Sequence, residues 1–66
     1  MPVKMRELKA ILRHAGFSCR SGKGSHTVWS HPDLSQFDIT LSGHDGEDAK
    51  PYQIKKVHKA LAQLGE

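Results

Sequence analysis

The residues best suited to do chemistry in this chain lie together in one glycine-rich turn, residues 21–26 (SGKGSH). Gly22 and Gly24 allow the backbone to approach a phosphate closely, and Lys23 adds a positive charge. An imidazole can accept and return a proton near neutral pH, so His26 is a candidate general base. The composition of the turn fits a phosphate-handling site, and it also fits an ordinary tight hairpin turn.

On RNA, a base at His26 could remove the proton of a 2′-hydroxyl, so that O2′ attacks the adjacent phosphorus. Lys23 or the amides of the turn would then stabilise the charge on the phosphoryl oxygens. The turn does not match the phosphate-binding loop of nucleotide-triphosphate proteins. That motif needs glycine where this chain has Phe17, and Ser or Thr where it has Gly24. By pattern alone, His26 is more often a half-exposed strand residue without a catalytic task.

The other four histidines are weaker candidates. His14 lies near the end of a predicted helix, where its charge suits the helix dipole, and His31 lies in an exposed turn. His44 lies beside Asp45 in an acidic loop, where it could reach a neighbouring site or be solvated. His58 falls on the apolar stripe of a helix, so we expect it at the edge of the core.

The cysteine and tryptophan have ordinary structural interpretations. No HExxH or CxxC spacing is present, and Cys19 with His26 and His31 matches no zinc pattern, so we expect neither a metal nor another cofactor. Cys19 cannot form an internal disulfide, which favours the reducing cytoplasm, and we expect it to be buried. Trp29 could stack on a base, but it is more often a core residue in a chain with so few aromatics.

Two segments with helical periodicity enclose this region. Residues 4–15 carry an apolar stripe that predicts an amphipathic helix, formed by Met5, Leu8, Ile11, Leu12 and Ala15. A second helix begins at Pro51, because proline is tolerated in the first turn. Its stripe consists of Ile54, Val57, His58, Leu61 and Leu64. Gly16 and Gly65 follow the two helices, where a left-handed cap favours glycine.

Three segments between the helices alternate as strands do. These are residues 17–20, residues 25–30 and residues 36–41, with glycine-rich or proline-containing turns between them. The second strand would place His26 on the face opposite Trp29. The order α-β-β-β-α predicts an α+β fold, a three-stranded antiparallel sheet with both helices on one face.

Length and composition set the outer limits. A chain of 66 residues forms one small domain, residues 1–66, and a content of 36% hydrophobic and 26% charged residues argues against disorder. No apolar run reaches the roughly 18 residues that a spanning helix needs, and the N-terminus does not resemble a signal peptide. We therefore expect no membrane association. The net charge of +3 is a mild basic bias, compatible with binding RNA or DNA.

Taken in order, these motifs resemble the HicA-type toxins over nearly the whole chain. The resemblance rests on a helix followed by Gly16-Phe17, KGSH at residues 23–26, Trp29, His31-Pro32-Asp33, His44, Lys50-Pro51 and the stripe from Ile54 to Leu64. The chain departs from the family pattern at the hairpin turn, residues 34–36, and in the loop after the third strand, which is acidic.

The resemblance implies a ribonuclease toxin, an mRNA interferase of a type II toxin–antitoxin pair that cleaves messenger RNA and arrests translation. It implies a fold related to double-stranded-RNA-binding domains, which share the α-β-β-β-α order. His26 takes the family's catalytic position. Gly24 and Ser25 carry over as the frame of the same motif, and together with Lys23 they are the residues expected to bind RNA.

The resemblance also implies a partner, a HicB-type antitoxin that covers the active site. The chain would then be a monomer when free and a hetero-oligomer with its antitoxin. Two other functions stay open: a non-catalytic RNA-binding module that uses Lys23 and the lysines of the second helix, and a toxin that has lost its activity. The general acid for the leaving 5′-oxygen also stays open between Lys23, His44 and water.

Overall fold

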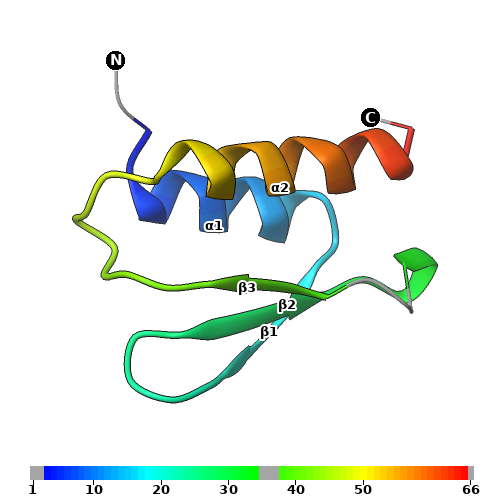
Figure 1. Ribbon diagram of the computed structural model, residues 1–66. Coiled ribbons are helices and arrows are strands. Elements are labelled where there is room, and N and C mark those ends of the chain that lie inside the picture. The colour runs from blue at the N-terminus through cyan, green and yellow to red at the C-terminus, as the bar shows by residue number, and fades with distance from the viewer. Residues whose placement is uncertain (1–2, 35–37, 66) are drawn as a thin grey trace.

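Two helices lie side by side across one face of a three-stranded sheet (Figure 1). The computed structural model describes residues 3–34 and 38–65. The elements in chain order are α1 (Met5–His14), β1 (Ser18–Ser21), β2 (Thr27–Ser30), the short 3-10 helix η1 (Pro32–Leu34), β3 (Ile39–Leu41) and α2 (Pro51–Gln63). The predicted α+β fold and its α-β-β-β-α order are confirmed, and none of the described helices is long and apolar enough to cross a membrane.

The sheet has the order β1-β2-β3, and both pairs of neighbours are antiparallel. Trp29 of the central strand lies opposite Cys19 of β1 and opposite Ile39 of β3. Every residue of β1 is exposed, whereas Ile39 and Leu41 of β3 are buried. The helices therefore cover β2 and β3, and β1 extends beyond the covered area.

The core forms around Trp29, which is fully buried between the sheet and the helices. It is surrounded by apolar side chains from both helices and from β3, including Leu8, Leu12, Ile39, Leu41 and Val57. Burying one such aliphatic side chain contributes about 1.5–3 kcal/mol. The Trp29 indole N–H donates to Thr27 Oγ1 at 2.9 Å, so the one polar atom of the ring is satisfied. Trp29 is a core residue, as expected.

The helix ends follow the predicted signals. Gly16 has a φ of +97° and Gly65 a φ of +81°, left-handed conformations that glycine adopts without strain. Pro51 is the first residue of α2, and the Lys50 N–H donates to Gln53 Oε1 at 2.8 Å. The buried face of α2 is made by Gln53, Val57 and Ala60.

Four sequence-based expectations about burial are wrong. Ile11, which was placed on the apolar stripe of α1, is exposed. Cys19 is exposed, because β1 lies outside the area that the helices cover. His58 is also exposed, because the buried face of α2 is centred on Val57 and runs through Gln53 and Ala60. His31 was expected to be exposed, and it is half-buried.

The predicted strand before η1 is shorter in the structure. β2 begins at Thr27, so the expectation that His26 lies within the strand is wrong. The turn continues through His26 because the His26 N–H donates to the Lys23 carbonyl at 3.0 Å. β3 contains residues 39–41. The expected start of that strand at residue 36 lies outside the described residues.

His31 fastens the end of α1 to η1. Its Nε2 lies 3.0 Å from the Ala15 carbonyl oxygen, and its Nδ1 accepts a hydrogen bond from the Asp33 N–H at 3.0 Å. A carbonyl only accepts, so Nε2 carries the hydrogen and the ring is neutral. The ring also meets Phe17 edge-on, with 5.1 Å between centroids. His31 is therefore a structural residue.

We predict that His31→Ala lowers the free energy of unfolding by about 1–3 kcal/mol, because two hydrogen bonds and the edge contact with Phe17 are lost. Chemical denaturation measures the change. The matched control is His14→Ala on the exposed side of α1, for which we expect a change within about 0.5 kcal/mol. Equal destabilisation by the two substitutions would contradict the structural role of His31.

Candidate active site

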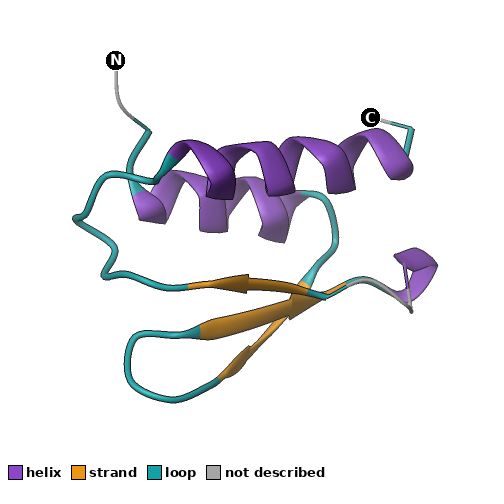
Figure 2. Cartoon of the chain, viewed as in Figure 1, coloured by secondary structure: helices purple, strands orange, loops and turns teal. Residues whose placement is uncertain are grey.

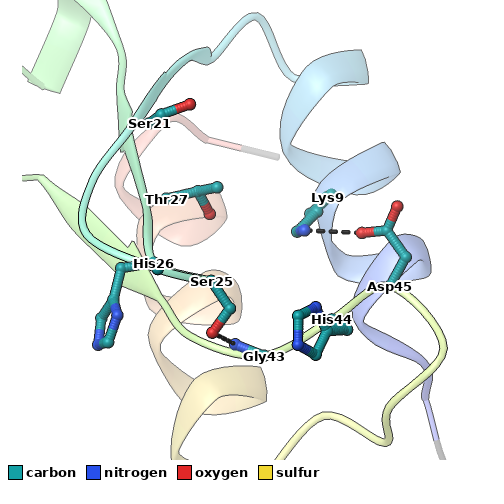
Figure 3. Close-up of a pocket in the computed structure, with 9 residues that line it drawn as sticks. Lys9, Ser21, Ser25, His26, Thr27, Gly43, His44 and Asp45 are labelled. Atoms are coloured by element: carbon teal, nitrogen blue, oxygen red, sulfur yellow. Dashed lines mark hydrogen bonds and ion pairs between the residues drawn. The ribbon is translucent and has the colours of Figure 1, made fainter.

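The β1–β2 loop and the loop that connects β3 to α2 lie at the same end of the sheet (Figure 2). Together with α1 they enclose an open pocket of about 330 Å³ (Figure 3). The pocket is lined by Lys9, Ser21, Gly24, Ser25, His26, Thr27, Gly43, His44 and Asp45. Three chain segments that are distant in sequence thus contribute polar side chains to one surface.

His26 is exposed at the edge of this pocket, and its ring orientation is set by the backbone of its own turn. Nδ1 lies 2.9 Å from the Lys23 carbonyl oxygen. Because that oxygen only accepts, Nδ1 must carry the hydrogen of this bond. In the neutral ring the other nitrogen, Nε2, then keeps its lone pair and can accept a proton from a ligand.

The structure brings Gly24 and Ser25 to the pocket with His26, but not the Lys23 side chain. Lys23 is exposed and contributes its carbonyl oxygen, the acceptor for His26. Gly24 has a φ of +59°, and a Cβ built there would meet nothing within 4 Å. The turn therefore favours glycine at this position for its backbone conformation and not for lack of space.

Ser25 joins the two loops. Its hydroxyl oxygen accepts a hydrogen bond from the Gly43 N–H at 3.2 Å. The preceding residue of the second loop is also held, because the Gln53 side-chain amide donates to the Ser42 carbonyl at 2.9 Å. Gln53 is 1% exposed and lies in the first turn of α2. The loop between β3 and α2 is therefore fixed from both sides.

His44 contributes a second imidazole to the same pocket. Its ring and that of His26 lie on opposite sides of the hydrogen bond between Ser25 and Gly43 (Figure 3). The His44 N–H donates to Glu47 Oε2 at 2.6 Å, which fixes its backbone. The sequence left open whether His44 reaches a neighbouring site, and the structure places it in the pocket of His26.

Sequence reasoning missed Lys9 in this pocket and the ion pair that it forms. Lys9 Nζ lies 2.7 Å from Asp45 Oδ1. The available signal was the position of Lys9 on α1, four residues after buried Met5, which places it beside the apolar stripe. Its partner in the loop after β3 could not be found from the sequence, because the pairing depends on the tertiary fold.

The pKa of Asp45 lies below its ordinary value of 3.8. The main cause is the hydrogen bond from Lys9, followed by the positive charge of that lysine, and Arg13 and Arg6 add smaller effects in the same direction. Desolvation acts in the opposite direction and is weaker. Asp45 is therefore ionised at neutral pH. In the described part of the chain, no three His, Cys, Asp or Glu side chains gather as ligands for a metal ion.

Comparison with known protein families identifies the family of this chain. The family described as HicA toxin of bacterial toxin-antitoxin matches residues 5–65. The chain belongs to the HicA toxin family. The match begins at the first residue of α1 and extends past the end of α2, so it includes both loops of the pocket. No curated protein matches the chain significantly.

Membership of the HicA family establishes the general role of the chain. It is a toxin of a toxin–antitoxin system, and an antitoxin is its partner. The resemblance noted from the sequence is thereby confirmed. The roles of His26, Lys23, Gly24 and Ser25 stay predictions, for which the structure supplies positions and contacts.

We predict that Ser25→Ala in this HicA toxin loosens the loop between β3 and α2. The substitution removes the acceptor of the Gly43 N–H, so we expect a loss of about 1 kcal/mol and faster hydrogen exchange at the Gly43 amide. Exchange measured by NMR gives both the size and the place of the change. Ser18→Ala, on exposed β1, is the control, and unchanged protection of Gly43 in Ser25→Ala would contradict the role of Ser25.

We predict that Asp45 titrates below 3.8 and that Lys9→Met raises its pKa towards that value, since Lys9 is the main cause of the shift. A carboxylate whose pKa is lower in the folded state stabilises the fold above its unfolded-state pKa, and this contribution is lost as the pH falls through the folded-state pKa. NMR titration of the Asp45 carboxyl carbon measures it. Lys4→Met, which removes the partner of Asp48, is the control and should leave Asp45 unchanged.

Proposed function

We propose that this HicA toxin is an endoribonuclease that cleaves messenger RNA and thereby arrests translation. The observation that carries the proposal is the contact between His26 Nδ1 and the Lys23 carbonyl, at the edge of an open pocket. This contact leaves Nε2 of the neutral ring available to a substrate hydroxyl. Membership of a toxin family supports a harmful activity of this kind.

In the proposed reaction, His26 Nε2 accepts the proton of a ribose 2′-hydroxyl. O2′ then forms a bond to the adjacent phosphorus, and the bond from phosphorus to O5′ breaks. The products are a 2′,3′-cyclic phosphate and an RNA end with a 5′-hydroxyl, whose oxygen takes a proton from a general acid. DNA lacks the 2′-hydroxyl and would not react by this route.

For the general acid, the pocket favours His44 over Lys23. His44 lines the same surface as His26 from the opposite loop, whereas the Lys23 side chain does not line it. A protonated imidazole can supply the proton that the leaving O5′ needs, and a neutral imidazole can take the 2′-hydroxyl proton, so two histidines suffice for both transfers. Ser25 would act as a positioning residue, because it links the loops that carry them.

The proposal includes the partner and the place of action. A HicB-type antitoxin would cover the pocket in a hetero-oligomer, and the free toxin would act as a monomer in the cytoplasm, where messenger RNA is translated. The open shape of the pocket supports its coverage by an antitoxin, because a protein surface can occlude both imidazoles at once.

A second candidate is a non-catalytic RNA-binding module. It is favoured by the exposed outer face of α2, which carries Lys55, Lys56 and Lys59 as possible phosphate contacts. The two functions differ in what happens to the RNA. A binding module would leave transcripts whole when the protein is produced without its antitoxin.

We predict that His26→Ala abolishes growth arrest and lowers RNA cleavage by at least about 10²-fold, the usual contribution of a general base. The fold should persist because His26 is exposed. Cleavage by purified protein, with and without a chelator, is followed on transcripts, and cleavage in the presence of chelator is expected. His58→Ala, on exposed α2, is the control and should retain activity.

Undiminished toxicity of the His26→Ala variant would contradict the role of His26. Intact transcripts after incubation with the wild-type protein would instead support the RNA-binding module or a toxin without activity.

A further inference from the structure

The pocket contains an ion pair that the proposed cleavage mechanism does not use. Lys9 extends from α1 into the pocket that His44 also lines, and its ammonium meets the carboxylate of Asp45 (Figure 3). The distance of 2.7 Å between Nζ and Oδ1 is that of a charge-assisted hydrogen bond. The pair therefore places one cation and one anion in the pocket that we propose for the substrate.

The two partners differ in their exposure. The Lys9 side chain is 12% exposed, whereas the Asp45 side chain is 67% exposed. Lys9 is thus held by the packing around α1, and Asp45 approaches its ammonium from the solvent side. A rotation of the Asp45 side chain would leave the Lys9 ammonium in the pocket without its anion.

The backbone that carries Asp45 is tied to the first turn of α1. The Asp45 carbonyl accepts from the Arg6 N–H at 3.2 Å, and the Glu47 carbonyl accepts from the Met5 N–H at 2.8 Å. These bonds keep Asp45 within reach of Lys9 while leaving its side chain free to rotate. The Asp45 carboxylate is therefore held by the backbone as an ion-pair partner of Lys9.

A carboxylate oxygen and a phosphate oxygen form the same kind of bond with an ammonium group. A phosphate bound in the part of the pocket lined by Lys9 and His44 would contact the Lys9 ammonium and would also be repelled by Asp45. Exposed ion pairs contribute only about 0–1 kcal/mol, so a phosphate can displace the carboxylate at small cost. RNA that enters the pocket thus competes with Asp45 for Lys9.

We propose that Lys9 is a phosphate-binding residue of the pocket and that Asp45 occupies its ammonium in the RNA-free toxin, as an internal substitute for the RNA phosphate. The inference rests on the proposed action on RNA and adds the group that holds the phosphate. It also gives a role to the acidic loop after β3, because Asp45 weakens RNA binding until a phosphate replaces it.

The test is RNA binding, measured by fluorescence anisotropy with a labelled single-stranded oligonucleotide. All variants carry His26→Ala, so that the RNA stays whole during the measurement. Asp45→Asn is expected to tighten binding about 3–10-fold and Lys9→Met to weaken it about tenfold, as expected for a charge-assisted hydrogen bond. Lys9→Arg keeps the charge and should bind RNA as well as the parent protein or nearly so.

A second ion pair supplies matched controls. Lys4 Nζ lies 2.6 Å from Asp48 Oδ1. Asp48 belongs to the same loop as Asp45, and Lys4 directly precedes α1, but neither residue lines the pocket. Asp48→Asn and Lys4→Met change the net charge as the test variants do. We expect each control to change RNA affinity by less than about twofold, since it shares only the long-range charge effect.

The double variant gives the decisive comparison. If Asp45 acts by occupying Lys9, Asp45→Asn should tighten RNA binding in the parent protein. In the Lys9→Met background, Asp45→Asn should change RNA affinity no more than Asp48→Asn does. Equal effects of Asp45→Asn and Asp48→Asn in the parent would overturn the inference. So would weaker binding by Asp45→Asn, unaffected binding by Lys9→Met, or no RNA binding by the parent protein.

Two further measurements keep the result clear. Thermal unfolding shows whether Lys9→Met has damaged the fold. If it has, normal RNA binding by Lys9→Arg together with tighter RNA binding by Asp45→Asn supports the inference. Weak binding by Lys9→Arg would count against it. RNA that is bound in the predicted pattern but not cleaved by the wild type would contradict the ribonuclease proposal and leave the phosphate site standing.

Discussion

The structure depends on the burial of Trp29 beneath two helices. A three-stranded sheet with one covered face has a single core layer, and Trp29 occupies the middle of the central strand at 0% exposure. It belongs to one core cluster with residues from α1, β3 and α2, so the three elements share the core that Trp29 fills. Loss of an aromatic ring of this size typically costs 3–5 kcal/mol, a large share of the stability of a small domain.

The register that surrounds Trp29 also builds the pocket. Trp29 pairs with Ile39, and two residues earlier in β2 Thr27 pairs with Leu41. The residues just before β2 and just after β3 are therefore neighbours, which brings the loop of His26 beside the loop of His44. The bond between Ser25 and Gly43 closes this junction. A one-residue slip of the strands would separate the two histidines and turn Trp29 out of the core.

The pairing of charges around the pocket could not be read from the composition of the chain. The chain carries a net charge of only +3, and the loop after β3 is acidic. Yet two of the three acids in this loop form ion pairs, Asp45 with Lys9 and Asp48 with Lys4, while Glu47 accepts a hydrogen bond from the His44 N–H. An acidic loop is thus compatible with an anionic ligand, because two of its carboxylates are paired with lysines of the α1 segment.

The sequence by itself determined the two helices and their glycine caps, the α-β-β-β-α order of the elements, the core position of Trp29 and membership of the HicA family. These follow from local periodicity, from residues with special backbone preferences and from ordered motifs. Only the tertiary structure decided that Cys19 and His58 are exposed, that His31 is a structural residue, that His26 precedes its strand, and that Lys9, His44 and Asp45 share one pocket. The physical reason is that alternation shows which residues share a face, whereas strand register and helix placement determine which face is covered and which loops meet.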